Sequence, residues 1–151
     1  MVTFQVFGIA QPKGSSRAFL PKGHTRPIVT SDNPRLKDWE SAVRSAAQLF
    51  AETHFIDGPV ALDLAFYLPK PKSAPKKRTH CITRPDTSKL IRSTEDALIG
   101  VLFKDDAAVV EIRATKAYAP VGSAAKAVIT VRSAAPAIAS EDQQLLLGAS
   151  A

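Results

Sequence analysis

The stretch from Val60 to Leu68 restricts the fold most, because its side chains alternate in character. Large apolar side chains at Val60, Leu62, Leu64 and Phe66 alternate with Ala61, Asp63, Ala65 and Tyr67. A period of two is typical of a β-strand with one buried face. A strand of this kind has to pair within a sheet and pack its apolar face against another layer.

Two segments have the spacing of an amphipathic helix. The first covers about residues 34–53, with apolar side chains at three- and four-residue steps: Leu36, Trp39, Val43, Ala46, Ala47 and Phe50. Pro34 suits its first turn, with Asp32 or Asn33 as the cap. The second opens at Pro85-Asp86-Thr87 and continues to about Leu98, and Gly100 ends it.

Further strands complete the predicted fold. We expect a strand buried on both faces at residues 3–9, a hairpin from 17–20 and 27–30, and two strands at 107–117 and 125–132. The order predicts an α+β fold in which a mixed or antiparallel sheet packs with two main helices. Residues 1–132 would form one domain. Residues 133–151 would be a flexible C-terminal tail, with a possible helical turn at 143–147.

Composition excludes several protein classes. The chain has 151 residues, 45% of them hydrophobic and 23% charged, which is average for a soluble domain and excludes a disordered or collagen-like chain. The single cysteine, Cys81, forms no internal disulfide, so a reducing compartment is expected. No run of about 18 apolar residues and no basic secretory leader is present. We therefore expect a cytoplasmic protein, beginning near Met1, with no membrane partner.

Positive charge is concentrated in residues 70–92. Eight Lys and Arg residues face one acid, Asp86, so this segment carries +7, whereas the whole chain carries +6. Three prolines and five basic residues in 69–82 predict a mobile loop, and the basic loop as a whole covers 69–84. The cluster is either a solvated charge run without a partner or the contact surface for a polyanion.

Most common catalytic motifs are missing. The sequence has no Walker A motif, no G-x-G-x-x-G, no H-E-x-x-H and no C-x-x-C pair. His80 and Cys81 are too few ligands for structural zinc, so Cys81 is interpreted as a free thiol in a flexible loop. What remains is carboxylate chemistry.

Several acids lie on or beside the second helix. At about 100° per residue, Asp86, Lys89, Ser93 and Asp96 share one helical face, and Asp105-Asp106 follow the helix. Each acid alone has an ordinary explanation: Asp86 as a helix N-terminal acid, or Asp96 as a solvated partner of Arg92. Together, beside a basic segment, they are consistent with metal-dependent cleavage of nucleic acid. Carboxylates would hold Mg²⁺ or Mn²⁺, which prefer oxygen ligands, and lysines would hold phosphates.

The stretch from Arg84 to Val110, RPDTSKLIRSTEDALIGVLFKDDAAVV, resembles the RusA-like Holliday junction resolvases, endodeoxyribonucleases of bacteria and their phages. The family pattern is roughly K/R-P-D-x-D-N/K-L-x-K/R, then D-A-L-x-G, then D-D-x-x-V. Weaker similarity extends to Gln11-Pro12-Lys13-Gly14, to the helix containing Trp39 and to Lys116, and so to about residues 3–132. The resemblance implies a homodimer that cuts branched DNA in recombination and repair, using Mg²⁺ or Mn²⁺, in a bacterial or phage-infected bacterial cell.

The resemblance also implies roles for single residues. Asp86 matches the first family acid, Asp105 and Asp106 match the downstream pair, and Asp96 matches the acid of D-A-L. These four are the candidate metal ligands. Arg92 stands at the position of the catalytic lysine, and Arg92 or Lys89 would stabilise charge on the phosphate. Ser88 departs from the family, which usually has a second acid there.

The candidate DNA contacts are basic residues of the loop and its surroundings: Lys13, Lys70, Lys72, Lys76, Lys77, Arg78, Arg84 and Lys116. Ser88 leaves open a second hypothesis, a branched-DNA-binding protein of the same fold that does not cut. A third is a basic module that binds acidic proteins through residues 70–78.

Overall fold

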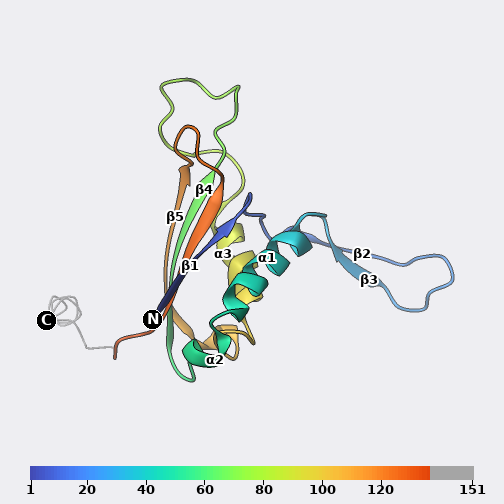
Figure 1. Cartoon of the computed structure of the whole chain (residues 1–151). Coiled ribbons are helices and arrows are strands. Elements are labelled where there is room, and N and C mark those ends of the chain that lie inside the picture. The colour runs from blue at the N-terminus through green and yellow to red at the C-terminus, as the bar shows by residue number, and fades with distance from the viewer. Residues whose placement is uncertain (137–151) are drawn as a thin grey trace, which may run out of the picture.

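The computed structural model describes residues 1–136 and centres on a four-stranded sheet (Figure 1). Its order is β1 (Val2–Phe7), β6 (Lys126–Ser133), β4 (Val60–Leu68) and β5 (Val109–Tyr118). The β4 strand pairs antiparallel with β6 and parallel with β5, whereas β1 pairs antiparallel with β6. The predicted α+β fold with a mixed sheet is confirmed.

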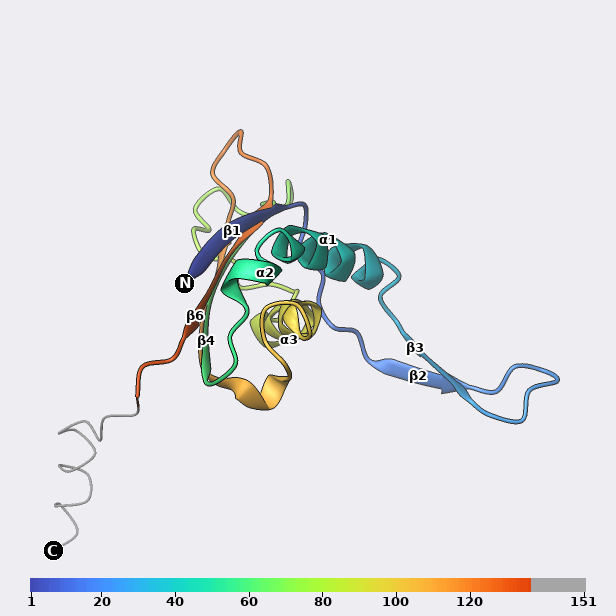
Figure 2. The ribbon, with the colours of Figure 1, turned by 60° about the horizontal axis from the view of Figure 1, so that its bottom comes forward.

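Helices cover one face of this sheet, as Figure 2 shows. They are α1 (Leu36–Gln48), the short α2 (Ala51–His54) and α3 (Thr87–Leu98). The indole nitrogen of Trp39 on α1 donates a 3.3 Å hydrogen bond to the Thr94 hydroxyl on α3. The predicted helix over residues 34–53 is interrupted after Gln48, where the chain turns and the Phe50 ring stacks on Phe4 of β1 at 5.7 Å.

The core lies between the sheet and the helices. The β4 side chains predicted to face it are buried, and they pack in one cluster with residues such as Val43, Leu90 and Leu98. The prediction that the first strand is buried on both faces is wrong. Only alternate β1 residues are buried, because no described element covers the other face of the sheet.

Two segments project from this body (Figure 1). One is the predicted hairpin, formed by β2 (Ser16–Phe19) and β3 (Ile28–Ser31), which we call the arm. The other is the basic loop between β4 and α3. Cys81 in this loop is a free thiol, as expected, and its side chain is buried and packs in the core cluster.

Beyond the last strand, one hydrogen bond ties the chain to the residue before β4. Strand β6 continues to Ser133, and the Ala134 N–H donates a 2.8 Å hydrogen bond to the Pro59 carbonyl. Residues 137–151, and with them most of the predicted tail and the turn at 143–147, lie outside the described residues. Within residues 1–136 no helix combines the length and apolar character needed to span a bilayer.

Candidate active site at the N-terminus of α3

Asp86 begins helix α3 as its N-cap residue. Its backbone is extended, with φ −69° and ψ 136°, and its carbonyl accepts 3.1 Å hydrogen bonds from the N–H groups of Lys89 and Leu90. The Asp86 carboxylate is exposed, and the Lys89 ammonium lies 3.8 Å from it. The partial positive charge of a helix N-terminus favours a carboxylate or a phosphate at this position.

Lys116 on β5 fixes the chain just before Asp86. Its ammonium donates two 2.8 Å hydrogen bonds, to the carbonyl oxygens of Thr83 and Pro85. The sequence predicts Lys116 as a DNA contact, whereas this ammonium is engaged by two backbone carbonyls. Its structural effect is to tie the edge of the sheet to the start of α3.

The loop Gln11–Ser15 lies along the other side of α3. The Lys13 N–H donates a 3.0 Å hydrogen bond to the Lys89 carbonyl, and the Lys13 ammonium pairs with the Asp96 carboxylate. Ser93, expected on the polar face of the helix, is fully buried, and its hydroxyl donates a 2.7 Å hydrogen bond to the Gln11 carbonyl. That expectation is corrected, because the loop covers Ser93 and fastens to it.

A hollow of about 570 Å³ opens between this loop and the start of α3. Its lining consists of Ala10, Gln11, Pro12, Lys13, Gly14, Ser15, Arg84, Pro85, Asp86 and Lys89. Three of these side chains are cationic, but the Lys13 ammonium is paired with Asp96, so Arg84 and Lys89 remain beside the Asp86 carboxylate. Excess positive charge beside a helix N-terminus suits a phosphate group, and Asp86 lies at the same wall.

A second group of acids lies at the opposite end of α3. Burial raises the pKa of Glu95, the nearby carboxylates of Asp106 and Asp96 raise it further, and Arg92 counteracts them. Asp106 begins a 3₁₀ turn, η1 (Asp106–Ala108), that leads into β5. Glu95 is not among the residues predicted from the sequence, although its position directly before Asp96 offered a signal.

These two groups of acids are separated along the helix. Asp86 and Glu95 are nine residues apart, which corresponds to about 13 Å of helical rise. One hard cation binds its oxygen ligands at about 2.0–2.6 Å, so it does not reach both ends. Among residues 1–136, no three His, Cys, Asp or Glu side chains are grouped to hold a metal ion.

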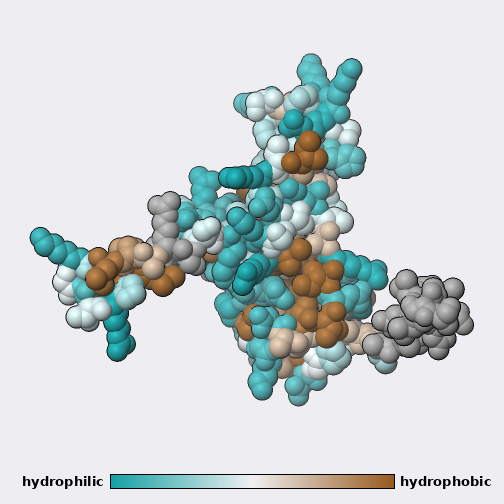
Figure 3. All heavy atoms as spheres, turned by 180° about the vertical axis from the view of Figure 1, so that it is seen from behind, coloured by the Kyte–Doolittle hydropathy of each residue, from teal (hydrophilic) through white to brown (hydrophobic). Residues whose placement is uncertain are grey.

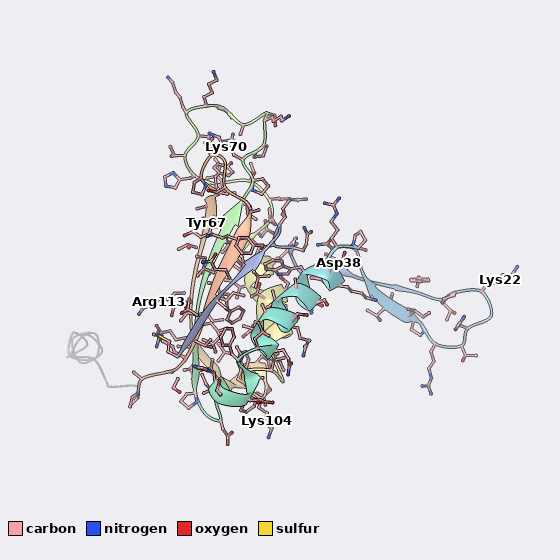
Figure 4. The ribbon with its side chains drawn as sticks, in the orientation of Figure 1. Lys22, Asp38, Tyr67, Lys70, Lys104 and Arg113 are labelled. Carbon is pink, nitrogen blue, oxygen red and sulfur yellow. The ribbon has the colours of Figure 1, made fainter. Side chains whose placement is uncertain are left out.

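The other predicted residues are placed as follows. Arg92 and Ser88 are exposed on α3 and do not line the hollow. Figure 4 shows Lys70 at the base of the basic loop, where its ammonium donates to the carbonyls of Lys76 and Arg78 at 3.1 and 2.7 Å. The side chains of Lys72, Lys76 and Lys77 are exposed on the loop, whereas Arg78 is half-buried.

Comparison with known proteins supports the resemblance seen in the sequence. The family described as "Endodeoxyribonuclease RusA" matches residues 10–132, which include the hollow, both groups of acids and the arm. An "Uncharacterized protein YqaN" of Bacillus subtilis (strain 168) is 29% identical over 127 residues, covering 78% of this chain and 87% of its own. The match over residues 10–132 spans most of the chain, and the chain therefore belongs to the RusA endodeoxyribonuclease family.

Proposed function

We propose that the protein is a metal-dependent, structure-selective endodeoxyribonuclease that resolves four-way junctions or related branched DNA in recombination and repair. The observation that carries this proposal is the hollow at the start of α3, where the Arg84 and Lys89 cations and the Asp86 carboxylate line a space suited to a phosphate. Membership of the RusA family supplies the reaction class.

The basic side chains in and around the hollow have proposed parts. Arg84 and Lys89 hold the phosphate of the DNA backbone, and Lys89, with Arg92 as the alternative, stabilises charge that develops on it. Lys13, which pairs with Asp96, holds the loop wall in place. Lys116 positions the backbone that carries Asp86.

The proposed cofactor is Mg²⁺ or Mn²⁺, which activates water and stabilises the leaving oxygen in phosphodiester hydrolysis. The proposed ligands are the family-matching acids Asp86, Asp105 and Asp106, with Asp96 as a further candidate. Carboxylates have the right chemistry, but their division between two ends of α3 does not form a metal site within residues 1–136. Support for the ion therefore comes from the family and from the ligand type.

The proposed setting follows the family. Exposed lysines of the basic loop contact the DNA backbone without reading its sequence, and a homodimer with two-fold symmetry suits paired cuts in a four-way junction. The cytoplasm of a bacterium or of a phage-infected bacterium is the expected location.

Cleavage of a labelled four-way junction, with and without Mg²⁺ or Mn²⁺, tests the proposal. We expect metal-dependent cutting by the wild type. Asp86→Asn or Asp106→Asn should abolish it while junction binding is retained or tightened, because removing a carboxylate also removes repulsion of phosphate. Asp57→Asn, which removes an exposed carboxylate outside the site, is the matched control and should cut normally. Full activity of Asp86→Asn would remove Asp86 from the mechanism.

A second candidate is a branched-DNA-binding protein of this fold that does not cut. Ser88 favours it, because a hydroxyl is a weaker ligand for a hard cation than the carboxylate usual at this position. Junction binding by the wild type without cutting at any concentration of Mg²⁺ or Mn²⁺ would support this candidate.

A further inference from the structure

The arm formed by β2 and β3 has no packing partner in the described chain. Its two strands pair with each other, and both Figures 1 and 2 show it extending away from the sheet and the helices. An isolated two-stranded hairpin is at best marginally stable in water, because it buries little apolar surface. The arm therefore has the character of a segment that gains its burial from a partner.

Apolar side chains are exposed on both faces of the arm. Ala18 pairs with Val29 and Phe19 with Ile28, so the two cross-strand pairs point to opposite sides. Phe19 is 50% exposed, Ile28 43% and Val29 64%. In Figure 3 a group of apolar surface lies on the arm, separate from the apolar surface of the body.

The arm is also cationic. Residues 16–31 contain Arg17, Lys22 and Arg26 and no Asp or Glu. Lys22 lies at the far end of the arm in Figure 4. A polyanion complements this charge. A two-stranded ribbon has the width of the DNA major groove, where apolar side chains contact thymine methyl groups and cations contact phosphates.

The base of the arm is part of the wall of the hollow. Strand β2 follows Ser15, a lining residue, and the Asp32 N–H closes the arm with a 3.1 Å hydrogen bond to the Ser15 carbonyl. The Asn33 amide donates to the Gln11 side chain and to the Pro12 carbonyl, at 3.2 and 3.1 Å. The direction of the arm is thereby fixed relative to the hollow.

We infer that the arm is a second DNA-contacting element, which lies in a groove of the duplex next to the phosphate held in the hollow. The inference rests on the proposed function and extends it, because it assigns DNA contacts to a segment outside the acids and the basic loop. The cationic tip contacts phosphates, and Phe19, Ile28 and Val29 supply apolar contact with base edges.

Two matched pairs of variants test the arm in metal-free binding assays with a four-way junction. Phe19→Ser is compared with Phe55→Ser, since Phe55 is 48% exposed and lies beyond α2. Arg26→Gln is compared with Arg113→Gln, since Arg113 is an exposed residue of β5 on the opposite side of the molecule. We expect each arm variant to lose roughly tenfold in affinity. Arg26→Gln should also reduce the slope of log affinity against log salt by about 0.9.

The outcomes separate the arm from the proposed function. If the wild type binds the junction and the arm variants bind it with the same affinity as their controls, the inference is overturned and the proposed function still stands. Absence of wild-type binding to any DNA overturns both. A variant in which two glycines replace residues 17–30 gives a further check. Normal affinity of this variant, or a lower mass in sedimentation showing that the arm holds a second copy, would overturn the inference.

Discussion

The ammonium of Lys116 donates a 2.8 Å hydrogen bond to the carbonyl of Pro85, the residue directly before Asp86. A second bond of the same length goes to the Thr83 carbonyl. One side chain on the edge strand β5 therefore satisfies two carbonyls that no helix or strand pairs. It also fixes where α3 starts, and so where the Asp86 carboxylate lies.

Lys116→Met should lower the free energy of unfolding by about 1–3 kcal/mol, because two hydrogen bonds to a charged donor are lost. It should slow junction cleavage while leaving junction affinity and its salt dependence unchanged, since the ammonium is held by carbonyls. Lys126→Met is the control, because the Lys126 ammonium donates to the Gln5 side chain on the open sheet face. A weaker salt dependence in Lys116→Met would show instead that Lys116 contacts DNA.

Glu95→Gln should change how stability depends on pH. Burial and the carboxylates of Asp106 and Asp96 raise the pKa of Glu95 above its ordinary value of 4.5. The folded state therefore binds this proton more tightly than the unfolded state, and the wild type loses stability as pH rises from 4.5 through the raised pKa. Glu95→Gln lacks this loss. Its free energy of unfolding should therefore exceed that of the wild type at pH 7, whereas below pH 4.5 it should not.

Thermal unfolding of wild type and Glu95→Gln across pH 3.5–7.5 measures this difference. Glu52→Gln serves as the control, because Glu52 is an exposed acid on α2. Equal pH profiles for wild type and Glu95→Gln would show that the Glu95 proton is bound equally in the folded and unfolded states.

The fold could be predicted from the sequence where local periodicity and packing agree. The alternation in β4 and the apolar spacing of α3 reproduce their observed bounds, since each element buries one face against the same core. The break after Gln48 was missed, because apolar spacing continues through Phe50. The Phe50 ring stacks on Phe4 of β1, which lies far away in the sequence, and local spacing does not contain such a contact.

The candidate site residues were named from the sequence, but their grouping in space was not. Asp86 was expected at the start of the helix, and the structure places it at the N-cap. Helical angles place Asp86 and Asp96 on one face, yet they ignore the rise along the axis that separates them. The contacts of Lys13 and Lys116 were not foreseen either, because both depend on tertiary neighbours.

Charge reversal in the basic loop should weaken binding to all forms of DNA. The double variant Lys76→Glu, Lys77→Glu removes two exposed cations, and the slope of log affinity against log salt should fall by about 0.9 for each lost phosphate contact. Arg113→Glu with Lys126→Glu makes the same change of charge on the open face of the sheet and should retain the slope. An unchanged slope in the loop variant would show that the loop stays away from DNA.

Ser88→Asp tests whether the family's missing acid limits metal binding. Because Asp86 is the non-helical N-cap residue, a side chain two positions later is not held on the far side of an ideal helix. A carboxylate at position 88 would thus be able to coordinate the same ion as Asp86. Hard cations bind a carboxylate better than a hydroxyl. The expected result is a lower concentration of Mg²⁺ or Mn²⁺ for half-maximal junction cleavage.

Ser88→Asp also has an effect that does not involve metal, because an acid in the first turn stabilises a helix by about 0.3–1 kcal/mol. Thr87→Asp, in the same turn, provides the same charge at a neighbouring position and controls for this effect. A lower metal requirement only in Ser88→Asp would assign position 88 to the ion. Restored cutting in Ser88→Asp from an inactive wild type would establish the binding-only candidate for the natural chain. Equal metal dependence in wild type and both variants would exclude position 88 as a ligand, and with it the family correspondence at that residue.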